Sequence, residues 1–101
     1  RESPVLELVT FRLAADLSPD AFVALAQATE TVLRRQPGYI SRRLVHAPDG
    51  LWTDIVEWDS LATATEAAKT VLSDPAYATF VASIDMAFVS MAHPALVWRM
   101  D

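Results

Sequence analysis

The 101-residue sequence contains no cysteine, only two glycines and a single lysine, Lys69. Without cysteine the chain can form no disulfide bond, no thiolate metal site and no thiol nucleophile. Two glycines are too few for the glycine-rich loops that bind nucleotide phosphates. No apolar run approaches the roughly 20 residues that a membrane helix needs, and the first residues do not resemble a signal peptide. We therefore expect a cytoplasmic protein that does not associate with membranes.

Positive charge is scarce as well. The formal net charge is -5, and the arginines form isolated pairs, Arg34–Arg35 and Arg42–Arg43, rather than a basic stripe. This distribution argues against nucleic-acid binding. The hydrophobic share of 52% is high for one small domain spanning residues 1–101. Such a share indicates that a partner covers part of the apolar surface.

The stretch from Leu51 to Trp58 reads as a strand that runs directly into a helix, because Asp59–Ser60 can cap the helix that follows. Side chains alternate along a strand, and apolar residues stand at both parities of this one. Neither face is plainly polar. We therefore expect the strand to be covered on both sides.

Capping residues and periodicity divide the rest of the chain. Ser18–Pro19–Asp20 is typical of a helix start, and Pro37–Gly38 of the residues just after a helix. Ser73–Asp74–Pro75 interrupts a later helix, because Asp74 can cap and Pro75 suits a first helical position. The pattern predicts a strand at 5–13, a helix at 18–35, strands at 39–46 and 51–58, a helix in two parts at 60–72 and 74–88, and a strand at 95–100.

This β-α-β-β-α-β order predicts a ferredoxin-like α+β fold, in which an antiparallel four-stranded sheet carries both helices on one face. The other face would be bare, yet the strands carry apolar side chains at both parities, so the residues leave open which face meets the helices. A bare face this apolar favours association. We expect two copies to pack sheet to sheet as a homodimer.

The residues 47–50 predict a hairpin turn with Gly50 at positive φ. Two registers of the flanking strands fit. In one, Arg42 lies diagonal to Asp54; in the other, shifted by one residue, Arg43 lies directly opposite Asp54. Either register predicts a cross-strand ion pair. Arg42 and Arg43 point to opposite faces of the sheet, so only one of them can enter a pocket.

Four short motifs stand at junctions between the predicted elements. They are Gln36–Pro37–Gly38–Tyr39, Glu57–Trp58–Asp59–Ser60, Ser73–Asp74–Pro75 with Phe80, and Met91–Ala92–His93. Over nearly the whole chain they resemble the dimeric α+β barrel proteins of the antibiotic biosynthesis monooxygenase type. The resemblance implies a pocket in each subunit, between the sheet and the helices. Characterised members of that type include cofactor-independent oxygenases acting on polycyclic phenols or quinones, and haem-degrading enzymes.

The haem-degrading members place a haem-ligating histidine on the second helix and an asparagine on the first strand. Here the predicted helix Leu61–Leu72 contains no histidine, and the sequence contains no asparagine. Haem degradation is therefore not expected, and we predict neither a cofactor nor a metal site. The oxygenase members rely on Trp, Tyr, Asn and Arg around a bound aromatic, and three of these four residue types are present.

His93 is the preferred chemical candidate, because an imidazole can accept a proton near neutral pH. Its structural alternative is a hydrogen bond to the connecting backbone. Arg43 is the expected oxyanion partner. The expected pocket lining is Phe11, Trp58, Tyr77, Phe80, Ile84 and Asp85. Trp58 is more often core than catalytic, and Asp85 has a solvated position at the helix edge as its alternative.

Three functions fit these residues. The first is a small oxygenase that oxidises a phenol- or quinone-type substrate without metal or flavin. The second is a non-catalytic module for small-ligand binding or dimerisation, and the third is a cyclase or isomerase that uses His93 as base. Cavity size separates the first two, because an open cavity of a few hundred Å³ favours the oxygenase.

Overall fold

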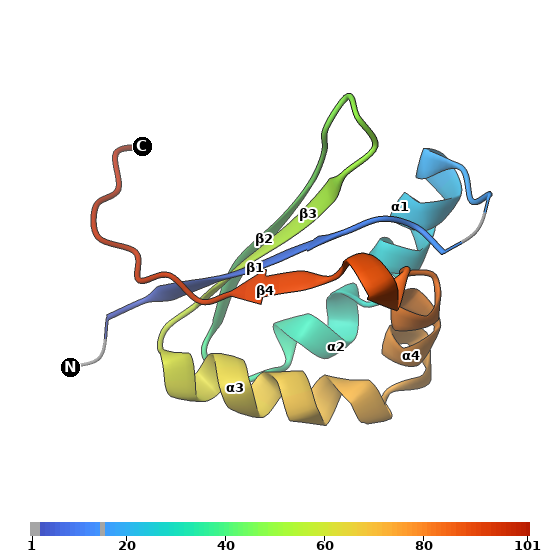
Figure 1. Ribbon diagram of the computed structural model, residues 1–101. Coiled ribbons are helices and arrows are strands. Elements are labelled where there is room, and N and C mark those ends of the chain that lie inside the picture. The colour runs from blue at the N-terminus through green and yellow to red at the C-terminus, as the bar shows by residue number, and fades with distance from the viewer. Residues whose placement is uncertain (1–2, 15) are drawn as a thin grey trace.

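The chain folds into an antiparallel sheet with all of its α-helices packed on one face (Figure 1). The structure is a computed structural model that describes residues 3–14 and 16–101. The strand order is β2-β3-β1-β4. The elements are β1 (Val5–Phe11), α1 (Pro19–Gln27), α2 (Glu30–Arg34), β2 (Tyr39–His46), β3 (Trp52–Trp58), α3 (Leu61–Thr70), η1 (Val71–Ser73), α4 (Pro75–Ala82), η2 (Met86–Phe88) and β4 (Ser90–Ala92). The predicted ferredoxin-like α+β fold is confirmed.

The helix predicted at 18–35 is broken into α1 and α2. Its start is as expected, since the Ser18 hydroxyl accepts a hydrogen bond from the backbone N–H of Ala21 at 3.1 Å. At the break, the buried Thr29 hydroxyl donates to the carbonyl oxygen of Ala26 at 2.6 Å. The Thr29 oxygen in turn accepts a hydrogen bond from Arg42 on β2 at 2.7 Å. A local hydrogen bond of Thr29 and a contact with a distant strand thus meet at the end of α1, and the local sequence does not show the second of them.

The hairpin between β2 and β3 adopts the first of the two predicted registers. Leu44 lies opposite Asp54, which places Arg42 diagonal to that carboxylate. Gly50 has a φ of 93°, in the left-handed region that favours glycine. The turn, the register and the ion pair between Arg42 and Asp54 are confirmed.

A second glycine, Gly38, allows α3 to start close to the beginning of β2. Its φ is 85°, and a Cβ at this position would lie 2.4 Å from both Asp59 Oδ1 and Thr63 Oγ1. Ser60 caps α3 as predicted, by accepting a hydrogen bond from the Thr63 N–H at 3.1 Å. Any other residue at position 38 would push this junction apart.

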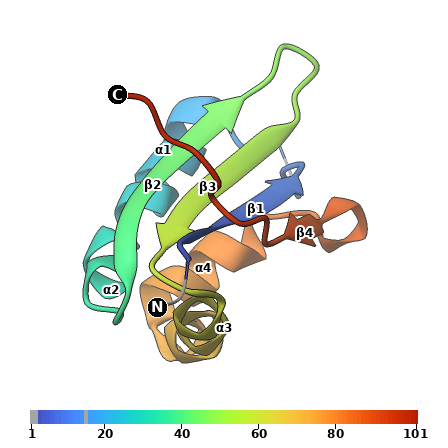
Figure 2. The same ribbon diagram turned by 90° about the vertical axis from the view of Figure 1, so that its left-hand side faces the viewer.

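The prediction of a last strand at 95–100 is wrong. The fourth strand is β4 at Ser90–Ala92, which pairs with the middle of β1. Ala95 forms only an isolated bridge with Val5, the first residue of β1, so the residues after 96 have no remaining part of β1 to pair with. The C-terminal segment instead crosses in front of the sheet in Figure 2, with the Trp98 side chain 74% exposed.

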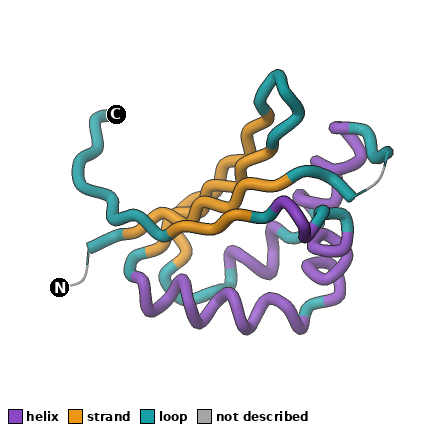
Figure 3. The backbone as a smooth tube through the Cα atoms, viewed as in Figure 1, coloured by secondary structure: helices purple, strands orange, loops and turns teal. Residues whose placement is uncertain are grey.

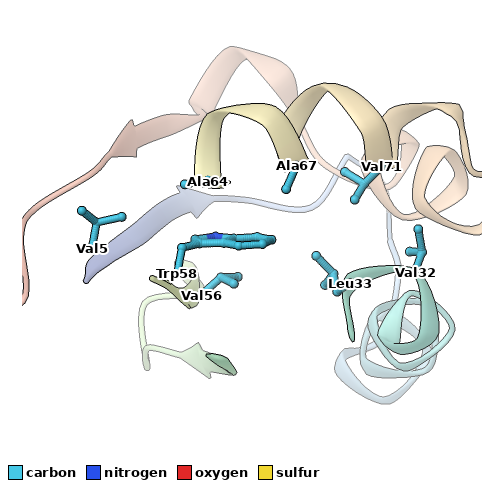
Figure 4. Packing of buried hydrophobic residues seen from close by; sticks show 8 residues of the cluster. All are labelled: Val5, Val32, Leu33, Val56, Trp58, Ala64, Ala67 and Val71. Atoms are coloured by element: carbon cyan, nitrogen blue, oxygen red, sulfur yellow. The ribbon is translucent and has the colours of Figure 1, made fainter. Parts of the chain in front are cut away.

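The core fills the space between the sheet and the helices, which the tube view separates into two layers (Figure 3). One cluster surrounds Trp58, whose indole ring lies between Val56 and the small residues Ala64 and Ala67 of α3 (Figure 4). A second cluster surrounds Phe22 of α1 at the other end of the sheet. The space left between these clusters forms the candidate site.

Candidate functional site

A cavity of about 160 Å³ lies between the sheet and the helices α3 and α4, smaller than the few hundred Å³ expected for the oxygenase. Strands β1 and β3 contribute one wall, and α3, α4 and η2 contribute the other. Small side chains on α3, Ala67 and Ala68, leave the space open. Five of the six residues expected to line a pocket do line it: Phe11, Trp58, Tyr77, Phe80 and Ile84.

Two of the predicted site residues lie outside this cavity. Asp85 does not line it; its carboxylate caps η2 by accepting a hydrogen bond from the Ala87 N–H at 3.0 Å. Arg43 lies on the opposite face of the sheet, where it borders a groove beside Trp98. The alternation along β2 explains this placement, because it turns Arg42 toward the helices and Arg43 away from them.

Glu7 is the site residue that the sequence analysis missed. It lies on β1, is buried, and forms part of the cavity wall. His93 Nε2 lies 3.3 Å from Glu7 Oε2, so the predicted histidine contacts a carboxylate rather than the connecting backbone. His93 itself does not line the cavity. Its contact with the cavity wall is the one with Glu7.

The environment of Glu7 makes its charged form less stable than it is in water. Burial raises the pKa of the Glu7 carboxyl, because a charged group loses its hydration inside the protein. The hydrogen bond and the charge of His93 oppose this shift, and the negative charge of Asp54 adds to it. The net direction is upward, which makes the Glu7 carboxylate a stronger proton acceptor than an exposed one.

The alternation of side chains along β1 could have identified Glu7 as a residue of the cavity wall. Glu7 shares its strand face with Val9 and Phe11, which also line the cavity. A carboxylate is unusual on the strand face that packs against the helices, because burying a charged group costs free energy. Its partner, His93, lies 86 residues away, so the pair could not be found by spacing.

The second wall carboxylate, Asp54, is tied to an arginine. Arg42 Nε and Nη2 donate to the two Asp54 oxygens at 2.9 and 2.7 Å, and the two side chains are 11% and 8% exposed. Burial alone would lower the pKa of Arg42, but the hydrogen bonds and charge of Asp54 outweigh it and raise that pKa. Arg42 therefore stays charged and neutralises Asp54. It also lies over the Phe80 ring, 5.2 Å from the ring centre.

Tyr77 brings a protonated hydroxyl to the wall. Burial and the negative charge of Asp54 raise its pKa from the ordinary 10.0 to about 12, although Arg42 acts in the opposite direction. Trp58 adds an indole N–H that is buried without a hydrogen-bond partner among the described residues. The polar part of the wall thus consists of a few groups within an apolar surface, which is the usual composition of a small-molecule site.

The pKa of Tyr77 gives a prediction that needs no ligand. Because the folded protein holds the phenol proton up to about pH 12, the unfolded chain ionises first as the pH rises. Stability is therefore expected to fall between pH 10 and pH 12, by up to about 2.7 kcal/mol. Tyr77→Phe should remove this fall, together with the latest step in the ultraviolet titration of tyrosinate. A wild-type curve with no step that Tyr77→Phe abolishes would contradict the prediction.

Two other site types are not found. Within residues 3–14 and 16–101, no three His, Asp or Glu side chains are grouped so that they could hold a metal ion. In the same part of the chain, no helix has the length and apolar character needed to cross a membrane.

The fold is shared with solved structures of oxygenases. SnoaB, a cofactor-independent oxygenase from Streptomyces nogalater, is 19% identical, with a TM-score of 0.62 over 98% of this chain and 96% of that one. A candidate monooxygenase from Shewanella loihica is 20% identical, with a TM-score of 0.69 over 98% and 99% of the two chains. A candidate antibiotic biosynthesis monooxygenase from Chloroflexus aurantiacus is 20% identical, with a TM-score of 0.61 over 98% of both chains.

No family model matches the sequence, and no curated protein matches it either. Identities of about one residue in five show a common fold and leave the chemistry to be argued from the site. The chain has the fold of the antibiotic biosynthesis monooxygenase type, as its motifs predicted.

Proposed function

We propose that the protein is a cofactor-independent monooxygenase that binds a small phenol- or quinone-type aromatic in the cavity and oxidises it with O₂. The observation that carries this proposal is Glu7, a buried carboxylate in a mostly apolar wall, whose Oε2 lies 3.3 Å from His93 Nε2. An apolar cavity favours the ring, and a carboxylate with a raised pKa can take the hydroxyl proton. The fold shared with SnoaB supports the general reaction type.

The proposed reaction balances with the phenol as the only source of electrons. Glu7 takes the hydroxyl proton, which raises the electron density of the ring. A bond forms between O₂ and a ring carbon that carries hydrogen, and the resulting hydroperoxide loses water to leave the quinone. One oxygen atom enters the product and the other leaves as water. The ring loses four electrons and O₂ gains four.

The test is turnover under ¹⁸O₂ with phenol, hydroquinone and a fused-ring phenol as substrates. We expect one O₂ to be consumed per quinone formed, and one ¹⁸O atom per product by mass spectrometry. Ala67→Leu, which adds bulk to the cavity wall, should abolish turnover. Ala62→Leu, at an exposed position of the same helix, should retain it. An absence of oxygen uptake with every substrate would contradict the proposal.

A second candidate is the non-catalytic ligand-binding module. The observation in its favour is that His93 does not line the cavity, so the wall offers two carboxylates, of which Asp54 is paired with Arg42, and no imidazole. Binding of aromatics without oxygen uptake in the same assay would establish this reading.

We also propose that the protein is a homodimer that associates through the sheet face opposite the helices. That face carries apolar side chains from three strands, and the C-terminal segment adds further exposed ones. They are Leu6, Leu8, Val45, Ile55, Val97 and Trp98. Apolar side chains on an uncovered sheet face favour association, and a second copy offers a matching face.

The dimer proposal predicts a mass of twice 11.1 kDa in sedimentation. Leu8→Glu places a charge on this face between Ile55 and Ala92 and should give monomers, because burying an unpaired carboxylate is costly. Leu61→Glu is the matched control, since Leu61 is also exposed but lies on α3, and it should remain dimeric. A monomeric wild-type protein at micromolar concentration would overturn the proposal.

A further inference from the structure

The size of the cavity limits what it can hold. Its volume is about 160 Å³, and an apolar cavity of about 150 Å³ holds one benzene molecule. The inner walls are aromatic side chains that are themselves packed in the core: Phe11, Trp58 and Phe80 are all nearly fully buried. Room for a second fused ring against these inner walls would require one of them to move, which a close-packed core resists. The side formed by Met86 and Met91 is exposed.

The charge of the wall limits the ligand further. The two carboxylates that reach the cavity are Glu7 and Asp54, while the side chains that pair with them, His93 and Arg42, do not line it. Tyr77 contributes a neutral hydroxyl. A ligand inside therefore meets carboxylate oxygens, the Tyr77 hydroxyl and the Trp58 N–H, and no positive charge. An anionic ligand would be repelled by the Glu7 carboxylate, because no cation in the wall offsets that charge.

Glu7 also requires a donor on the ligand. Its Oε2 faces His93, but a carboxylate has two oxygens and can accept several hydrogen bonds. A ring hydroxyl can donate one of these. An aromatic ether of the same size cannot, and it would leave the buried carboxylate without that partner.

We infer that the cavity takes a neutral phenol of one ring, with its hydroxyl hydrogen-bonded to Glu7, and that it rejects aromatic carboxylates and fused-ring phenols. This inference rests on the proposed function for the location of the site, and it names the substrate class. It narrows the polycyclic phenols or quinones that the resemblance implied to single-ring phenols.

A ligand series tests the inference by NMR titration of the ¹⁵N-labelled protein at pH 7. Phenol should bind at least about tenfold more tightly than anisole, because only phenol donates a hydrogen bond to a charged acceptor. Benzoate should bind at least about a hundredfold more weakly than phenol. 2-Naphthol should bind more weakly than phenol. Anisole equal to phenol, benzoate within threefold of phenol, or 2-naphthol tighter than phenol would each overturn the inference.

Glu7→Gln tests the residue itself. We expect the phenol-to-anisole preference to fall at least about threefold and benzoate affinity to rise at least about tenfold, since the charge is removed while the shape is kept. Glu66→Gln removes the same charge from an exposed position on α3 and should change neither. Unchanged phenol-to-anisole and phenol-to-benzoate affinity ratios in Glu7→Gln would also overturn the inference.

The binding and oxygen assays fail independently. Binding in the predicted order without oxygen uptake upholds the ligand class and contradicts the oxygenase. Oxygen uptake with fused-ring phenols alone upholds the oxygenase and overturns the ligand class.

Discussion

Arg42→Ala is expected to destabilise the protein by about 3–5 kcal/mol, because it leaves Asp54 buried without its partner. The same substitution removes the hydrogen bonds that Arg42 donates to Thr29 and to the carbonyl oxygen of Ala26, at the break between α1 and α2. For a domain of this size the melting temperature should fall by roughly 12 °C or more. Urea unfolding followed by circular dichroism measures the effect.

Arg43→Ala is the matched control for this experiment. Arg43 is the next residue along β2, but it is exposed on the other face of the sheet. Its loss should change the unfolding free energy by no more than about 0.5 kcal/mol. If the two variants were equally stable, the ion pair would not be the element that holds β2 and β3 to the helices.

Glu7→Gln is expected to lower kcat/KM for phenol oxidation by about 10²- to 10⁴-fold, the usual range for loss of a general base. His93→Gln should have a smaller effect, because His93 acts only through Glu7. It should instead change the pH profile. His93 lowers the pKa of Glu7 by its hydrogen bond and its charge, so its removal raises that pKa further. The Glu7 carboxylate then forms at higher pH, so the acid limb of the pH–rate profile should shift to higher pH.

Oxygen-uptake rates between pH 5 and pH 9 give both measurements. Glu66→Gln, which removes a carboxylate far from the cavity on the exposed side of α3, should match the wild type at every pH. A full rate in Glu7→Gln would remove Glu7 from the mechanism. An unshifted profile in His93→Gln would show that the contact between His93 and Glu7 has no role in proton transfer.

The sequence predicted the helix starts and the turn, because these depend on residues that are neighbours in the chain. Ser18, Ser60 and Asp74 cap helices as their sequence contexts indicate, and Gly50 takes the positive φ that its turn requires. The hairpin is local too, and both of its possible registers predicted an ion pair between an arginine and Asp54.

The cytoplasmic location of the protein stays a prediction.

Features that depend on distant contacts were not predictable in the same way. The break at Thr29 depends on Arg42, which approaches from a strand that follows the helix. The last strand was placed too late, because the end of its pairing is set by where β1 begins. Glu7 was not predicted as a site residue because its partner, His93, lies near the other end of the chain. Residue type and the alternation of side chains predicted most of the cavity lining. The contact between Glu7 and His93 is visible only in the tertiary structure.

We propose that the cavity between the sheet and α3 and α4 binds a phenol. A crystal structure of the protein with bound phenol tests this proposal most directly. We expect the phenol ring between Trp58 and Phe80, with its hydroxyl oxygen about 2.8 Å from a Glu7 carboxylate oxygen. Phenol bound only elsewhere on the molecule, or a cavity filled by the side chains of α3 and α4, would contradict it.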